Sequence, residues 1–117
     1  MEKLPKTEFS EDELKLIKAL KETGPENPET KEALITWTKQ GEDRAAVEQR
    51  EAETRGENIH RSNIEFSLRR ARLYRAAGFM DEAWDHLEDA RREALQADQT
   101  DLYEEAMRIM DEMDRGD

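Results

Sequence analysis

The first apolar pattern of the chain lies between residues 9 and 24 and has the spacing of an amphipathic helix. Ser10, followed three residues later by Glu13, forms a capping box, in which each side chain satisfies a backbone N–H at the helix start. Phe9 and Leu14 have the spacing of a hydrophobic staple, and Gly24 ends the pattern. The sequence therefore predicts a helix between Ser10 and Gly24 that buries a narrow stripe of Leu14, Ile17 and Leu20.

A second helix is predicted to begin at Asn27, an N-cap residue, because Pro28 then occupies the first helical position and its missing N–H is not needed. The helix is predicted to run to about Gln40, where Gly41 interrupts it. It carries the apolar side chains Ala33, Leu34, Ile35 and Trp37. Residues 42–57 hold few apolar side chains and form either a solvated helix or a mobile connection, with helix slightly favoured.

The strongest pattern begins at Asn58 and predicts a helix with two apolar faces. One face consists of Ile64, Leu68, Ala71, Tyr74 and Gly78. The other, nearly opposite, consists of Phe66, Leu73 and Ala77. Because a helix that is apolar on two sides packs on two sides, we expect this helix to be central. Between the faces lies a stripe of Glu65, Arg69, Arg72 and Ala76.

Two further helices follow Gly78. The first presents Met80, Ala83, Trp84, Leu87, Ala90, Ala94 and Ala97, whose alanines allow two helix axes to approach closely. The last, near residues 101–114, presents Leu102, Ala106, Ile109, Met110 and Met113. No segment alternates as a strand does. We therefore expect one compact all-α domain of about five helices, with an N-terminal helical segment and polar connection over 1–57 and a helical hairpin with a capping helix over 58–117.

The spacing Ala71-x2-Tyr74-x3-Gly78-x4-Ala83-x3-Leu87-x2-Ala90 resembles the tetratricopeptide repeat (TPR), a helical hairpin of about 34 residues. Small residues in this pattern let the two helices touch, and Gly78 opens the turn. The helix near 101–114 then corresponds to a terminal capping helix. An upstream echo, Leu34-x2-Trp37-x3-Gly41-x4-Ala46, lacks its second half, because Arg50 and Glu53 stand where a leucine and an alanine would match.

The resemblance implies a protein–protein interaction module or adaptor that is not an enzyme. In TPR proteins the first helix of each hairpin lines a groove for partner peptides, which here implies a partner-binding face of Glu65, Arg69 and Arg72, with Arg75 at its edge. Two arginines on one helical face can hold a carboxylate, so the expected partner is an acidic or C-terminal peptide. The alternative, which we favour, is that these arginines pair with Asp81, Asp85, Glu88 or other acids of the same chain.

The last helix offers a second candidate surface. Its methionines widen the apolar arc beyond what a capping helix needs, which indicates either core packing or a contact with a homodimer partner or another protein at Met110 and Met113. Two other functions stay open: a homo-oligomeric structural or regulatory helical protein, and an acidic inhibitor or nucleic-acid mimic whose active face is residues 80–117.

Charge is distributed unevenly along the 117 residues, which carry a net charge of −11. Residues 61–79 contain five arginines and one glutamate, whereas residues 80–117 contain four arginines and fourteen acids. If the two segments are neighbouring helices, their charges can pair within the chain. The negative total repels polyanions, so nucleic acid is not an expected partner.

Signals for catalysis or metal binding are weak. The absence of cysteine excludes disulfides and zinc–thiolate sites. Glu57-x-x-His60 has the spacing used by di-iron bundles, but these need a second such motif. No phosphate-binding loop or nucleophile elbow occurs, so we expect no cofactor, no metal site and no catalytic residue. A polar chain without a signal peptide or an apolar run long enough to span a membrane is expected to be cytoplasmic.

Overall fold

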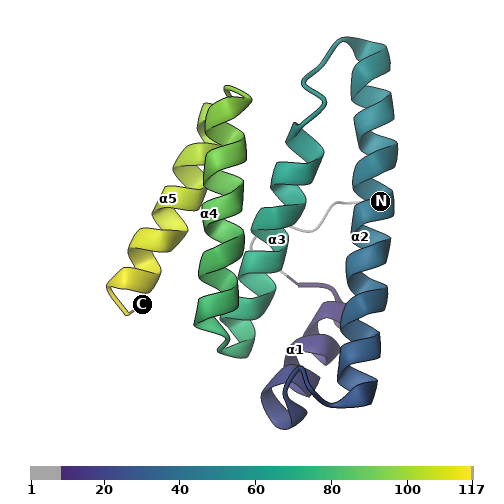
Figure 1. Ribbon diagram of the computed structural model, residues 1–117, viewed down its shortest axis with the longest axis vertical. Helices are drawn as coiled ribbons and strands as arrows, with labels where there is room; N and C mark the ends of the chain where they lie inside the picture. Colours follow the sequence, from purple (N-terminus) through teal and green to yellow (C-terminus); the bar gives the residue numbers. More distant parts are fainter. Residues whose placement is uncertain (1–8, 117) are drawn as a thin grey trace.

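The computed structural model describes residues 9–116, which form five α-helices joined by short connections (Figure 1). The helices are α1 (Glu11–Thr23), α2 (Pro28–Arg55), α3 (Arg61–Ala77), α4 (Met80–Gln96) and α5 (Thr100–Asp114). The described residues contain no strand, so the predicted all-α fold of about five helices is confirmed. None of the helices combines the length and the apolar composition that crossing a membrane requires.

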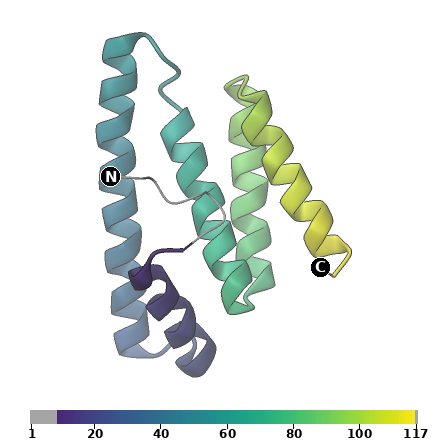
Figure 2. The ribbon, with the colours of Figure 1, turned by 180° about the vertical axis from the view of Figure 1, so that it is seen from behind.

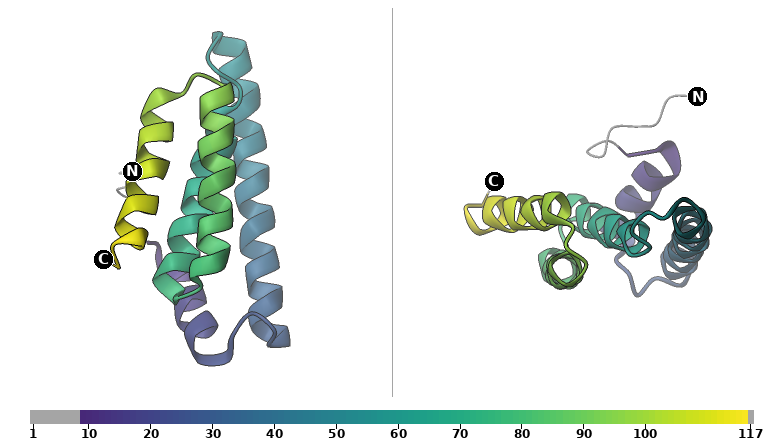
Figure 3. Two further views of the ribbon diagram at one scale, coloured as in Figure 1. Left: turned by 60° about the vertical axis from the view of Figure 1, so that its left-hand side comes forward. Right: turned by 90° about the horizontal axis from the view of Figure 1, so that it is seen from above.

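Helix α3 lies at the centre, between α2 on one side and α4 and α5 on the other (Figures 1 and 3). One core cluster joins α3 to α4 and α5 and consists of Ile64, Leu68, Ala71, Leu87, Ala90, Ala94, Leu102, Ala106, Ile109 and Met110. A second cluster joins another side of α3 to α1 and consists of Leu16, Ile17, Leu20, Leu73 and Ala77. The prediction of a central helix that packs on two sides is therefore confirmed.

The α3–α4 hairpin depends on small residues and on a left-handed turn. Ala71, Ala83 and Ala90 are fully buried at 0% exposure, and their small side chains let the two helices approach closely. Gly78 ends α3 with a φ of 90°, a conformation that side chains with a Cβ rarely adopt. The chain can therefore turn directly from α3 into α4.

Helix α1 begins as its capping box predicts. The Glu13 N–H donates to Ser10 Oγ at 3.2 Å, and the Ser10 N–H donates to Glu13 Oε1 at 2.9 Å. The predicted buried stripe is only partly right, because Leu14 is 54% exposed while Leu16 is buried. The buried face of α1 is Glu13, Leu16, Ile17 and Leu20. A carboxylate therefore occupies the first position of an otherwise apolar face.

Gly41 does not interrupt α2, and the predicted end near Gln40 is wrong. The helix continues to Arg55, which confirms helix as the better of the two interpretations of residues 42–57. Gly41 is buried against the ring of Phe66, and a Cβ added at this position would lie 2.0 Å from Phe66 Cε1. Its lack of a side chain therefore serves the close approach of α2 to α3. The same ring packs against Trp37, with 5.4 Å between the ring centroids.

Candidate functional site

The five arginines of α3 each pair with a carboxylate on another helix. Arg69 pairs with Glu13 of α1, and Arg70 pairs with Glu42 of α2 at 2.8 Å. The remaining three reach α5, in the pairs Arg61–Asp101, Arg72–Glu105 and Arg75–Glu112. The basic segment of the sequence is therefore matched by acids from three neighbouring helices, and α3 is the electrostatic centre of the bundle as well as its geometric centre.

Glu13 connects three helices through one carboxylate. Its side chain is only 8% exposed, and it accepts hydrogen bonds from Trp37 Nε1 at 3.2 Å and from Arg69 Nε at 2.9 Å, besides the capping bond from Ser10. Burial would raise the pKa of Glu13, but the hydrogen bonds from Arg69 and from the Ser10 backbone outweigh it and hold the pKa of this carboxyl below its usual value. The group is charged at neutral pH and ties α1 to α2 and α3.

Helix α5 is fastened to α3 by ion pairs of different burial. Arg72 and Glu105 are 11% and 13% exposed, so their pair is largely shielded from solvent. Arg61 and Asp101 are more exposed but pair through two hydrogen bonds, one of them from Arg61 Nη1 to Asp101 Oδ1 at 3.0 Å. The hydrogen bond from Arg61 lowers the pKa of Asp101 to about 2. These pairs fix the register of the last helix along α3.

An open cleft of about 580 Å³ lies between α1, α2 and α3 and reaches α5. Its origin is a difference in helix length. Helix α1 has 13 residues and α2 has 28, which correspond to about 20 and 42 Å at the helical rise. Helix α1 therefore covers only one part of α2 (Figure 2). The charged side chains that line the cleft are Asp12, Glu13, Arg44, Glu48, Glu65, Arg69, Arg72 and Glu105.

Three of the predicted partner-binding residues, Glu65, Arg69 and Arg72, line this cleft. All three are engaged within the chain, because Arg69 and Arg72 hold Glu13 and Glu105, and Glu65 pairs with Arg61 at 3.2 Å. An acidic peptide would have to compete with Glu13 and Glu105. The cleft is therefore where the sequence places a partner surface, but Arg69 and Arg72 are not free cations there.

The other predicted partner-binding residues lie outside the cleft. Arg75 pairs with Glu112 at 3.0 Å. Met110 is 8% exposed and belongs to the core cluster of α3, α4 and α5, and the partly buried Met113 packs against that cluster. The side chain of Met107, at 40% exposure, is more accessible than either. Most of the apolar arc of α5 is thus used inside this chain.

Several residues that line the cleft were not among the predicted partner-binding residues. Trp37, Arg44 and Glu48 lie on the side of α2 that faces the cleft, and Asp12 lies at the start of α1. The spacing of these three α2 residues is that of one helical face. In a helix that is continuous through Gly41, this spacing predicts that the three side chains share a surface. The supposed break at this glycine hid the pattern.

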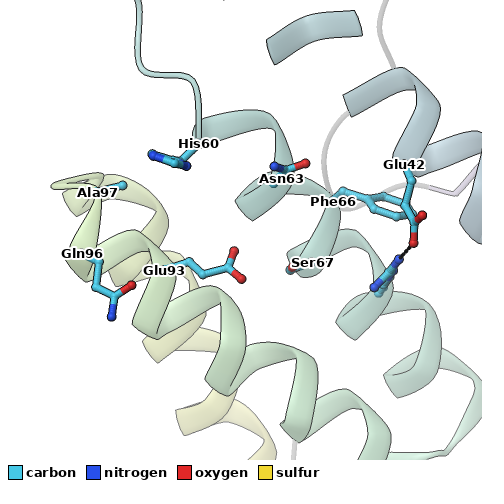
Figure 4. Close-up of a pocket in the computed structure, with 9 residues that line it drawn as sticks. Glu42, His60, Asn63, Phe66, Ser67, Glu93, Gln96 and Ala97 are labelled. Atoms are coloured by element: carbon cyan, nitrogen blue, oxygen red, sulfur yellow. Dashed lines mark hydrogen bonds and ion pairs between the residues drawn. The ribbon is translucent and has the colours of Figure 1, made fainter. Parts of the chain in front are cut away.

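A second pocket, of about 510 Å³, lies on the other side of Phe66, between α2, α3 and α4. Figure 4 shows Asn63 and Ser67 of α3 facing Glu93 of α4 across it. Phe66 lines both this pocket and the cleft, so the two hollows share this side chain.

Neither histidine lines the cleft. His60 lines the pocket, and His86 stacks on Tyr74 with 5.5 Å between the ring centroids. Burial and the nearby positive charge of Arg70 lower the pKa of His86. Over residues 9–116, no group of three or more histidine, aspartate and glutamate side chains is arranged to hold a metal ion.

Comparison of the chain with protein-family models, with curated proteins and with solved structures gave no match. What the protein does is therefore inferred from its cleft, from the ion pairs around the cleft and from the packing order of the helices.

Proposed function

We propose that this protein is a non-enzymatic protein–protein interaction module, which receives a segment of a partner protein in the cleft between α1, α2 and α3. The observation that carries the proposal is the cleft itself. The aromatic rings of Trp37 and Phe66 line it, and charged side chains surround them. An apolar centre with a polar rim is the usual anatomy of a protein interface.

The packing order of the helices supports a TPR-like arrangement for α3, α4 and α5. Helices α3 and α4 form a tight hairpin, and α5 packs mainly against α4 and also touches α3, as the first helix of a following repeat packs against the hairpin before it. Helix α2, with 28 residues, is too long for one half of a 34-residue repeat. We therefore limit the proposed likeness to α3, α4 and α5.

Site-specific crosslinking tests this function. Because the sequence contains no cysteine, a single Gln40→Cys substitution places one thiol at the cleft, and Asp85→Cys places one on α4, which contributes no residue to the cleft. Each variant is labelled with the same photoreactive group and irradiated in an extract of the source cells, and the crosslinked proteins are identified by mass spectrometry.

We expect one or a few proteins to be crosslinked at position 40 and not at position 85, and an excess of unlabelled protein to compete for them. Circular dichroism of both variants checks that each is folded. The same crosslinked proteins at both positions, or none at position 40, would contradict the proposal.

A further inference from the structure

We infer that the cleft takes a basic, amphipathic segment of its partner. The inference rests on the proposed function and adds the chemistry of the partner, which is opposite in charge to the acidic peptide that the arginine spacing alone predicts. Three features carry it: the engaged state of Arg69 and Arg72, the sign of the charges that remain, and the aromatic side chains in the same lining.

Two of the three cleft arginines, Arg69 and Arg72, already hold carboxylates of this chain. Glu13 is 8% exposed and Glu105 is 13% exposed, so neither can turn freely into solvent when another acid approaches Arg69 or Arg72. Breaking such a pair would leave a carboxylate enclosed without its cation, which is strongly unfavourable. An incoming acidic side chain would therefore find no free guanidinium at these two positions.

The charges that remain available are mostly negative. Asp12 and Glu48 are exposed and form no ion pair with any other described residue. Glu65 is 41% exposed and lies 3.2 Å from Arg61, so it keeps a free side toward solvent. Arg44 is the one cleft cation without an ion pair among the described residues. The net charge of −11 adds an attraction for cations over a longer range.

The aromatic side chains indicate an amphipathic segment rather than a purely charged one. Trp37 and Phe66 are partly exposed and lie in tilted contact, with 5.4 Å between their centroids. They line the same cleft as Asp12 of α1 and Glu48 of α2. A partner helix that presents leucine-like side chains on one face and lysine or arginine beside them would match both the rings and the carboxylates.

Binding of two matched peptides tests this chemistry. The probe is a fluorescein-labelled peptide of about 14 residues, built of leucine on one helical face and lysine on the other, and its counterpart carries glutamate in place of lysine. Fluorescence polarisation is measured at near-physiological salt. We expect the lysine peptide to bind at least about tenfold more tightly than the glutamate peptide.

Charge variants locate the binding. We expect the double variant Asp12→Asn/Glu48→Gln to weaken binding of the lysine peptide about fivefold to twentyfold, and Arg44→Gln to strengthen it about two- to fivefold. The matched control Asp85→Asn/Glu88→Gln removes the same charge from α4 and should leave the affinity unchanged. The charge reversal Asp12→Lys/Glu48→Lys should invert the preference and favour the glutamate peptide.

Equal weakening by the cleft variant and by the α4 control would overturn the inference, because attraction would then follow net charge rather than the cleft. Tighter binding of the glutamate peptide to the unmodified protein, or no binding of either peptide, would overturn it as well. The crosslinking at position 40 decides the proposed function separately. A partner crosslinked there through an acidic segment would keep the function and remove only the inference about charge.

Discussion

Replacement of Glu13 by alanine is the most informative single perturbation of this fold, because one carboxylate joins the N-cap of α1, Trp37 of α2 and Arg69 of α3. Loss of the capping interaction costs about 1 kcal/mol. Removing one partner of a buried ion pair costs about 3–5 kcal/mol, and we reduce this to about 1–3 kcal/mol because Arg69 is 23% exposed and can gain solvent. We therefore expect Glu13→Ala to lower the free energy of unfolding by about 2–4 kcal/mol.

Thermal unfolding followed by circular dichroism measures this loss. At about 2.1 cal/mol/K per residue, the entropy of unfolding of a chain of this length is about 0.25 kcal/mol/K, so Tm should fall by about 8–16 °C. The control is Glu51→Ala at the pair of Glu51 and Arg55, whose side chains are 60% and 54% exposed and lie 4.0 Å apart. An exposed pair of this kind contributes less than about 1 kcal/mol, so the control should barely change Tm.

A double-mutant cycle distinguishes the pair from general damage to the core. Glu13→Leu completes the apolar face of α1, and Arg69→Met removes the cation that would be left without a partner. We expect the double variant to lose less free energy of unfolding than the two single variants lose together, by at least about 1.5 kcal/mol. Additive losses, or a Glu13→Ala loss below about 1 kcal/mol, would refute the role assigned to this carboxylate.

Three further measurements test other parts of the structure. Gly41→Ala would stabilise an ordinary helix by about 1 kcal/mol, but here the ring of Phe66 must move to make room for the added Cβ. We therefore expect this variant to lower the free energy of unfolding in urea by about 1–2 kcal/mol. In a Phe66→Ala background, the same substitution should raise the free energy of unfolding instead. Because the folded pKa of Asp101 is lowered from 3.8 to about 2, its contribution to stability is present above pH 3.8 and lost as the pH falls toward 2. In Asp101→Asn, the free energy of unfolding should therefore depend less on pH between 3.8 and about 2 than it does in the unmodified protein. Because burial lowers the pKa of His86, its titration midpoint measured by NMR should lie below 6.5. The stability that depends on the neutral form of His86 should decrease as the pH falls below 6.5. A midpoint at or above 6.5 would contradict the packing of His86 on Tyr74.

Helix starts and the central position of α3 could be predicted from the sequence because they depend on residues within one or two turns. The capping box of Ser10 and Glu13 and the N-cap of Asn27 both form as predicted, with Asn27 Oδ1 accepting from the Glu29 N–H at 3.0 Å. The two apolar faces of α3 likewise follow from helical spacing alone. Such signals are local, and no distant segment can easily change them.

The cleft and its charge could not be predicted in this way, because both depend on contacts between distant segments. Arg69 meets Glu13 across 56 positions of sequence, and Arg72 meets Glu105 across 33, so spacing on α3 could show two arginines but not that both are engaged. The same holds for Gly41, a helix breaker by propensity that becomes a contact surface once Phe66 packs on it. The sequence by itself determined that the chain is helical and where its helices begin. The continuation of α2 through Gly41 and the packing of the helices decided where a cleft remains and which charges face it.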